Sequence, residues 1–102
     1  MAGFTLSDMK KLQRSKKRVR KQGLRDVLTK TKKGVRYDVW GNTIAIYKPK
    51  TKKLTVSDAG WATKLTKDRL NKLLPPKHTI RQRKFRWYSG KRIWKGKKTI
   101  KV

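Results

Sequence analysis

The feature that most constrains this chain is its charge. Its 102 residues include 32 Lys and Arg against five acidic residues, which gives a formal net charge of +27. Self-repulsion at this density opposes a compact state, so the excess is tolerable mainly where binding to a polyanion offsets it. Nucleic acid is the usual polyanion partner of a strongly basic chain. The composition therefore predicts a small protein that binds nucleic acid.

The acidic residues offer little material for catalysis. Glutamate is absent, and the five acids are scattered among cations at Asp8, Asp26, Asp38, Asp58 and Asp68. General acid–base catalysis and two-metal nucleases usually need paired carboxylates, and no two of these acids lie close in sequence. Cysteine is absent, which excludes disulfides and thiolate metal sites, and His78 has no ligating neighbour. We therefore expect a binding protein and not an enzyme, with no catalytic residue, metal or cofactor.

The first third of the chain is expected to be a basic arm. Most of its cations fall in the stretch from residue 9 to residue 21, which contains only Met9, Leu12 and Val19 as apolar residues. They form a narrow stripe, so a helix ending at Gly23 would be marginal alone and would order on binding a polyanion. The spacing of Val27 and Leu28 behind Leu24 favours a second short helix. Residues 1–34 are therefore predicted to be an N-terminal arm, helical or ordered on binding.

From residue 35 the apolar period changes from helical to alternating. Two strands are expected around a Gly41-Asn42 turn, and a third at residues 54–56. Leucines at helical spacing predict a helix over residues 67–74 that Pro75-Pro76 stops, and strands return from residue 79. The predicted fold class is α+β, a small antiparallel sheet of three or more strands packed on one helix. This compact domain spans residues 35–102 and follows the basic, partly helical arm.

The largest apolar side chains of this domain are expected to form its core, because a small domain needs them there. They are Trp40, Ile44, Ile46, Trp61, Leu70 and Leu73.

The candidate nucleic-acid-binding residues fall into three groups. The arm supplies Lys10, Lys11, Arg14, Lys16, Lys17, Arg18, Arg20 and Lys21. The start of the predicted helix supplies Thr66, Lys67 and Arg69, where capping alone and phosphate binding are equally favoured. The acid-free C-terminal stretch supplies Arg81, Arg83, Lys84, Arg86, Trp87, Lys91 and Arg92. Its basic residues interleave with aromatics, which suits backbone tracking with base stacking, although core packing is the favoured alternative for Trp87. Binding is expected to need both flanks, with the middle holding them in place.

Short runs in the middle of the chain share a pattern with known proteins. They are WGNTIA at 40–45, GWAT at 60–63, TKDRLN at 66–71 and WY at 87–88. Together they resemble a family of small bacteriophage proteins with a YGNTIA … GW-T-TTK-RLN … WY pattern, over about half the chain. Trp40 and Leu65 depart from that pattern. The resemblance implies a phage origin and no particular activity, and the basic arm lies outside it.

Three functions remain open. The phage resemblance favours the first, a phage protein that binds DNA largely through phosphates with low sequence specificity. The second is an RNA-binding structural protein of a ribonucleoprotein such as a ribosome. The third is a basic adaptor that docks on an acidic host or virion protein. No apolar run approaches a membrane span. We therefore expect a location in the host cytoplasm, associated with the nucleoid or packaged in the virion.

Overall fold

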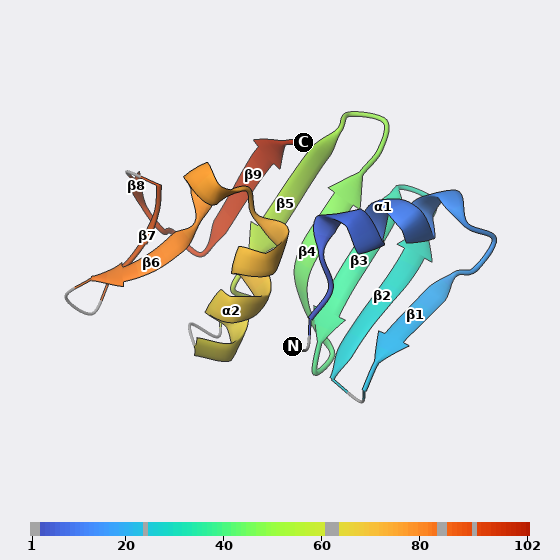
Figure 1. The fold of residues 1–102 in the computed structure, drawn as a ribbon, viewed down its shortest axis with the longest axis horizontal. Coiled ribbons are helices and arrows are strands. Elements are labelled where there is room, and N and C mark those ends of the chain that lie inside the picture. The colour runs from blue at the N-terminus through green and yellow to red at the C-terminus, as the bar shows by residue number, and fades with distance from the viewer. Residues whose placement is uncertain (1–2, 24, 61–63, 84–85, 91) are drawn as a thin grey trace.

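The computed structural model describes residues 3–23, 25–60, 64–83, 86–90 and 92–102. Within these ranges the protein is mostly β, with two antiparallel sheets and two short α-helices (Figure 1). The larger sheet has the strand order β1-β2-β3-β4-β5-β9. Its strands are β1 Val19–Gln22, β2 Asp26–Thr31, β3 Gly34–Val39, β4 Asn42–Lys48, β5 Lys53–Ser57 and β9 Lys97–Lys101. The smaller sheet contains β6 Ile80–Arg83, β7 Arg86–Ser89 and β8 Arg92–Ile93. The helices are α1 Leu6–Arg14, α2 Lys64–Leu73 and the short 3₁₀ helix η1 Pro76–His78.

This architecture corrects the predicted α+β fold of a small sheet on one helix behind an arm. Residues 19–31 are not an arm, because β1 and β2 are the first two strands of the six-stranded sheet. The expected domain boundary at residue 35 falls inside the β2–β3 hairpin, in which Thr31 pairs with Gly34. Periodicity alone does not distinguish a short apolar run in a strand from one in a helix. In β2 the burial alternates strictly from Asp26 to Thr29, with Leu28 fully buried, as in a strand.

Helix α1 begins with a complete capping box. The Thr5 hydroxyl accepts a hydrogen bond from the Asp8 backbone N–H, and the Asp8 carboxylate accepts one from the Thr5 N–H. The helix ends at Arg14, so it is shorter than the sequence predicts. Met9 and Leu12 are buried against the sheet, and Figure 1 shows α1 lying across β2 and β3. The narrow apolar stripe of the expected arm is therefore part of the core.

Both helices lie on one face of the six-stranded sheet (Figure 1). The buried side chains of the strands point to this face, among them Leu28, Tyr37 and Leu54. Their neighbours point to the opposite, open face and stay partly accessible, among them Ile46 and Thr55. One face thus makes the core, and no described element covers the other.

The β3–β4 turn is shifted by one residue from its predicted place. Its central residues are Trp40 and Gly41, with φ of +52° and +78°, the pattern of a type I′ hairpin turn. This places Trp40 outside the core with 61% of its surface exposed, so its predicted burial is wrong. Ile46 is only half-buried on the open face, whereas Ile44 is buried.

The later elements follow the prediction more closely. Strand β5 contains the predicted strand at residues 54–56, and α2 begins three residues before the predicted helix. Leu70 and Leu73 are buried as expected, and Trp61 lies outside the described residues. Strand β9 was not predicted, and it forms one edge of the larger sheet next to β5.

Candidate nucleic-acid interface

One end of the six-stranded sheet collects four segments that are distant in sequence. Because neighbouring strands are antiparallel, the α1–β1 loop, the β2–β3 turn, the β4–β5 turn and the end of β9 all meet there. The backbone N–H of Lys30 donates to the Arg18 carbonyl, and the N–H of Val102 donates to the Lys52 carbonyl, which fastens the outer segments to their neighbours. In Figure 1 this is the upper end of the sheet, where the C-terminus lies.

These segments carry ten exposed cations, which we call the basic rim. They are Lys16, Lys17, Arg18, Lys32, Lys33, Lys48, Lys50, Lys52, Lys53 and Lys101. None of them forms an ion pair within the described residues.

The five aspartates lie elsewhere. Asp26 begins β2, Asp38 is near the end of β3 and Asp58 follows β5, so all three are at the opposite end of the sheet. Asp8 and Asp68 belong to the two helices. Three of the five acids pair with Arg: Asp8 with Arg20, Asp38 with Arg36 and Asp26 with Arg69. The fold therefore keeps the aspartates away from the basic rim, while further exposed cations lie on α1, β1, α2 and the smaller sheet.

Three lysines of the basic rim form a row across adjacent strands. Lys48 of β4 is directly opposite Lys53 of β5, which is directly opposite Lys101 of β9. All three are exposed and share one face of the sheet. Like charges directly opposite each other destabilise a sheet, and their Cβ atoms are typically about 5 Å apart. An anion lying over the row would remove this repulsion.

The arm group of predicted site residues is divided between several surfaces. Lys16, Lys17 and Arg18 belong to the basic rim, and the exposed Lys11 and Arg14 follow α1 toward it. Lys10 lies over the Tyr47 ring at 5.9 Å. Arg20 points to the helix-covered face, where it pairs with Asp8 at 3.3 Å and stacks on Phe4. Lys21 is exposed one residue further along β1.

The predicted site residues of the helix, Thr66, Lys67 and Arg69, are mostly buried inside the protein. Arg69 has an 8% exposed side chain, and its Nε donates to Asp26 Oδ1 at 2.9 Å. The Tyr37 hydroxyl donates to the same oxygen at 2.6 Å and accepts from the Phe4 N–H. Burial, together with the hydrogen bond to Asp26, raises the pKa of the Tyr37 hydroxyl, so it stays a donor. Thr66 is buried and Lys67 half-buried. Arg69 is therefore a structural residue that joins α2 to β2.

The third group lies on the smaller sheet, which projects from the far side of α2 (Figure 1). Arg81, Arg86 and Arg92 are exposed there, and Trp87 is half-buried against the core. The Arg83 side chain, Lys84 and Lys91 lie outside the described residues. Nearby, burial and then the charges of Lys98 and Lys77 lower the pKa of His78. This surface is cationic but separate from the basic rim.

Sequence reasoning missed most of the basic rim. Lys32, Lys33, Lys101 and the four lysines of the KPKTKK run at residues 48–53 were not predicted as site residues. That run lies at the predicted end of one strand and start of the next, so its position at a hairpin tip was available as a signal. The meeting of the four segments depends on the strand order, which includes the unpredicted β1, β2 and β9.

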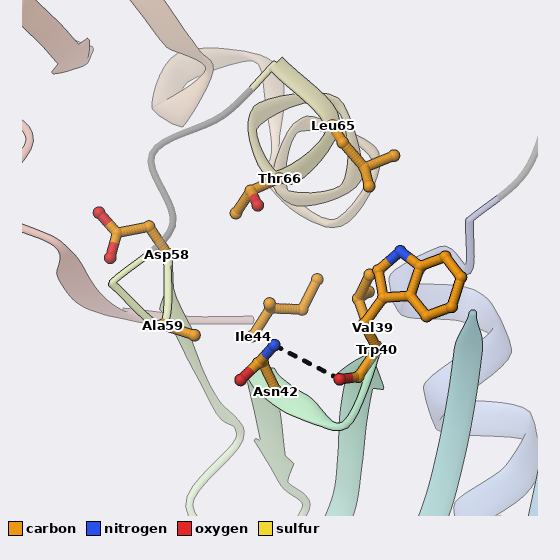
Figure 2. A pocket seen from close by; sticks show the side chains of 8 residues that line it. All are labelled: Val39, Trp40, Asn42, Ile44, Asp58, Ala59, Leu65 and Thr66. Atoms are coloured by element: carbon orange, nitrogen blue, oxygen red, sulfur yellow. Dashed lines mark hydrogen bonds between the residues drawn. The ribbon is translucent and has the colours of Figure 1, made fainter.

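A pocket of about 390 Å³ lies at the end opposite the basic rim, between the β3–β4 turn and α2 (Figure 2). Val39, Ile44, Ala59 and Leu65 give it an apolar lining, and Trp40 stands at its edge.

The described residues show no group of three metal-ligating side chains. Among the helices in the described ranges, none is long and apolar enough to cross a membrane. No curated protein and no solved structure matches the chain. The model of the Kyanoviridae Gp96 protein family matches residues 7–100, which covers the pocket, the smaller sheet, the larger sheet up to residue 100 of β9, and every cation of the basic rim except Lys101. The chain therefore belongs to this family of bacteriophage proteins.

Proposed function

We propose that this phage protein binds nucleic acid, with DNA as the favoured ligand, through phosphate contacts along the basic rim. The observation that carries the proposal is the segregation of charge. Ten exposed cations lie together at one end of the sheet, while three of the five acids lie at the other end and two lie in the helices. A surface of this kind attracts a polyanion whatever the rest of the molecule does.

The dimensions of the rim suit a nucleic-acid backbone. Six strands leave five spacings of about 4.8 Å, so the rim is ~24 Å long. Duplex DNA carries about one charge per 1.7 Å of its axis, or roughly 14 phosphates over that length. Each neutralised phosphate releases counterions, which drives association at low salt. The repulsion within the row of Lys48, Lys53 and Lys101 is relieved by the same contacts.

The composition of the rim favours low sequence specificity. Nine of its ten cations are Lys, and Arg18 is the one Arg. Lys acts as a flexible point charge, whereas base recognition relies chiefly on the bidentate donors of Arg, Asn and Gln. We therefore propose a protein that follows the backbone of DNA and is not an enzyme.

Membership of a phage family is what favours DNA over RNA in this proposal, because a phage protein can meet both the phage genome and the host nucleoid. The location proposed is the host cytoplasm, at the nucleoid or in the virion.

The test compares two variants of equal net charge. The rim variant K48Q/K50Q/K52Q/K53Q removes four lysines of the β4–β5 hairpin. The control variant K64Q/K77Q/K95Q/K97Q removes four exposed lysines outside the rim. Binding of a labelled duplex is measured across a series of salt concentrations. Loss of four phosphate contacts lowers the slope of log K against log salt by about 3.6, and affinity near 0.15 M salt falls roughly 10²–10³-fold. The control should stay within a few-fold of wild type.

Equal losses in both variants would mean that total charge, and not the rim, governs binding. A strong preference of wild type for folded RNA over duplex DNA would replace the proposed ligand. Weak binding to every nucleic acid at low salt would leave the acidic-protein partner as the better account.

A further inference from the structure

Trp40 occupies a position that the local chain geometry does not favour. Both central residues of a type I′ turn need positive φ, which suits Asn or Asp followed by Gly. A bulky non-Gly residue at positive φ is unusual, and such strain tends to persist where it serves a function. Trp40 adopts φ +52°, and 61% of its surface is exposed. Arg25 lies over its ring at 5.3 Å from the guanidinium carbon to the ring centre.

The indole lies at the edge of the apolar pocket between the β3–β4 turn and α2. Figure 2 shows Trp40 and Leu65 on one side of the pocket and Asp58 on the other, with Ile44 and Ala59 between them. Asp58 is already engaged, because its carboxylate accepts from the Trp94 indole N–H at 3.0 Å and from the Gly60 N–H. The Asn42 side chain is bonded to the Trp40 carbonyl. An occupant would therefore meet mainly apolar atoms. One patch thus carries both an exposed aromatic side chain and an apolar hollow.

Charge limits what can approach this patch. The pocket lies at the end of the sheet that holds Asp26, Asp38 and Asp58, away from the basic rim. Asp26 and Asp38 are paired with Arg69 and Arg36, so the patch itself carries one charge of each sign, Arg25 over Trp40 and Asp58 across the pocket. Two copies of a chain with net charge +27 therefore repel less here than at the uniformly cationic rim. A twofold interface also requires a self-complementary patch, in which the projecting group and the receiving hollow lie side by side. Trp40 and its pocket meet this condition.

We infer that a second copy of this chain docks here, with each Trp40 indole entering the apolar pocket of the other copy. The twofold dimer has its two basic rims at opposite ends. If the proposed function holds, such a dimer presents two separate DNA-binding surfaces and can bridge two duplexes or two segments of one. Trp is enriched at the energetic centres of interfaces, and Trp40 remains 61% exposed although Arg25 lies over its ring, so most of the indole is available to a partner.

The test uses a substitution that keeps the turn. Trp40→Asn creates the Asn-Gly pair that a type I′ turn prefers, so the variant should fold at least as stably as wild type. Ile93→Asn is the control, because Ile93 is also an exposed apolar residue, 50% exposed, but lies on β8. Leu65→Lys, which places a charge in the pocket from α2, is the second test variant. Association is measured by analytical ultracentrifugation in the absence of nucleic acid, so the result does not depend on the proposed function.

Wild type and Ile93→Asn should form a dimer in the micromolar range. Trp40→Asn and Leu65→Lys should each raise the dimer dissociation constant at least tenfold, with thermal unfolding of Trp40→Asn unchanged or at higher temperature. The inference is overturned if wild type stays monomeric at the highest concentration reached, or if both test variants dimerise like wild type. A monomeric wild type whose DNA affinity falls in Trp40→Asn would instead assign the pocket to nucleic acid.

Discussion

Asp26→Asn tests whether a buried ion pair fastens α2, and with it the segment before α1, to the sheet. The Asp26 side chain is 1% exposed and accepts hydrogen bonds from Arg69 of α2 and from Tyr37 of β3. Tyr37 in turn accepts from the Phe4 N–H, just before α1. The substitution keeps the size of the side chain but removes its negative charge. The buried guanidinium of Arg69 then has no counter-charge.

The expected loss of stability follows from the burial of Arg69. Removing one partner of a buried ion pair typically destabilises a protein by about 3–5 kcal/mol, because the remaining charge is left in a poor solvent. Small domains have roughly 5–15 kcal/mol in total, so this variant should lose a large part of its stability. Asp38→Asn is the matched control on the neighbouring strand. Its partner Arg36 has a 46% exposed side chain, and such pairs contribute about 0–1 kcal/mol.

The free energy of unfolding of both variants is measured by urea denaturation followed by tryptophan fluorescence. The free energy of unfolding should fall by several kcal/mol in Asp26→Asn and by less than about 1 kcal/mol in Asp38→Asn. A double variant, Asp26→Leu with Arg69→Met, should recover much of the loss because it removes both charges. Equal and small losses in the two single variants would refute the buried network. Arg69 would then again be a candidate for ligand binding.

Three further predictions concern α1 and the sheet. Met9→Ala should lower the free energy of unfolding by about 2–5 kcal/mol, since Met9 is fully buried, and an unchanged urea midpoint would argue for a detached arm. Thr5→Ala should cost about 1 kcal/mol at neutral pH through loss of the cap. Burial acts to raise the pKa of Asp8, but hydrogen bonds from Thr5 and the charge of Arg20 outweigh it, so the pKa lies below the usual 3.8. The difference in unfolding free energy between wild type and Thr5→Ala should therefore shrink as the pH falls below that value. Ile46→Thr should cost less than about 1.5 kcal/mol, because Ile46 is only half-buried on the open face, and a loss like that of Met9→Ala would show that this face is covered.

Local signals in the sequence predicted the middle of the fold well. Alternation from residue 35, a turn near Gly41 and a proline stop after Leu74 correspond to β3, β4, β5 and α2. The local signals failed where tertiary contacts determine the secondary structure. Val27 and Leu28 satisfy a helical spacing and a strand equally, and pairing with β3 selects the strand. In the sequence, Met9 and Leu12 form a stripe that looks too sparse to pack. In the structure, these two side chains are enough to attach α1 to the apolar face of the sheet.

The candidate site was only partly accessible to sequence reasoning. Cation density identified the run at residues 16–18, which lies in the basic rim, but it could not separate Arg20, whose side chain turns to the other face. Arg69 looked like a phosphate ligand because its partner Asp26 is 43 residues away. The polarity of charge depends on strand order, since residues 48–53 and Lys101 become neighbours through the β5–β9 pairing. Composition predicted a cationic protein, and topology determines where its cations gather.

The most direct test of nucleic-acid binding along the basic rim is amide chemical-shift mapping of the ¹⁵N-labelled protein during titration with a short DNA duplex. If phosphates bind along the basic rim, shifts should concentrate at residues 16–18, 32–33, 48, 50–53 and 101, while the turn at Trp40 and helix α2 change little. Shifts confined to the smaller sheet around Arg81, Arg86 and Arg92, with the basic rim unperturbed, would contradict it.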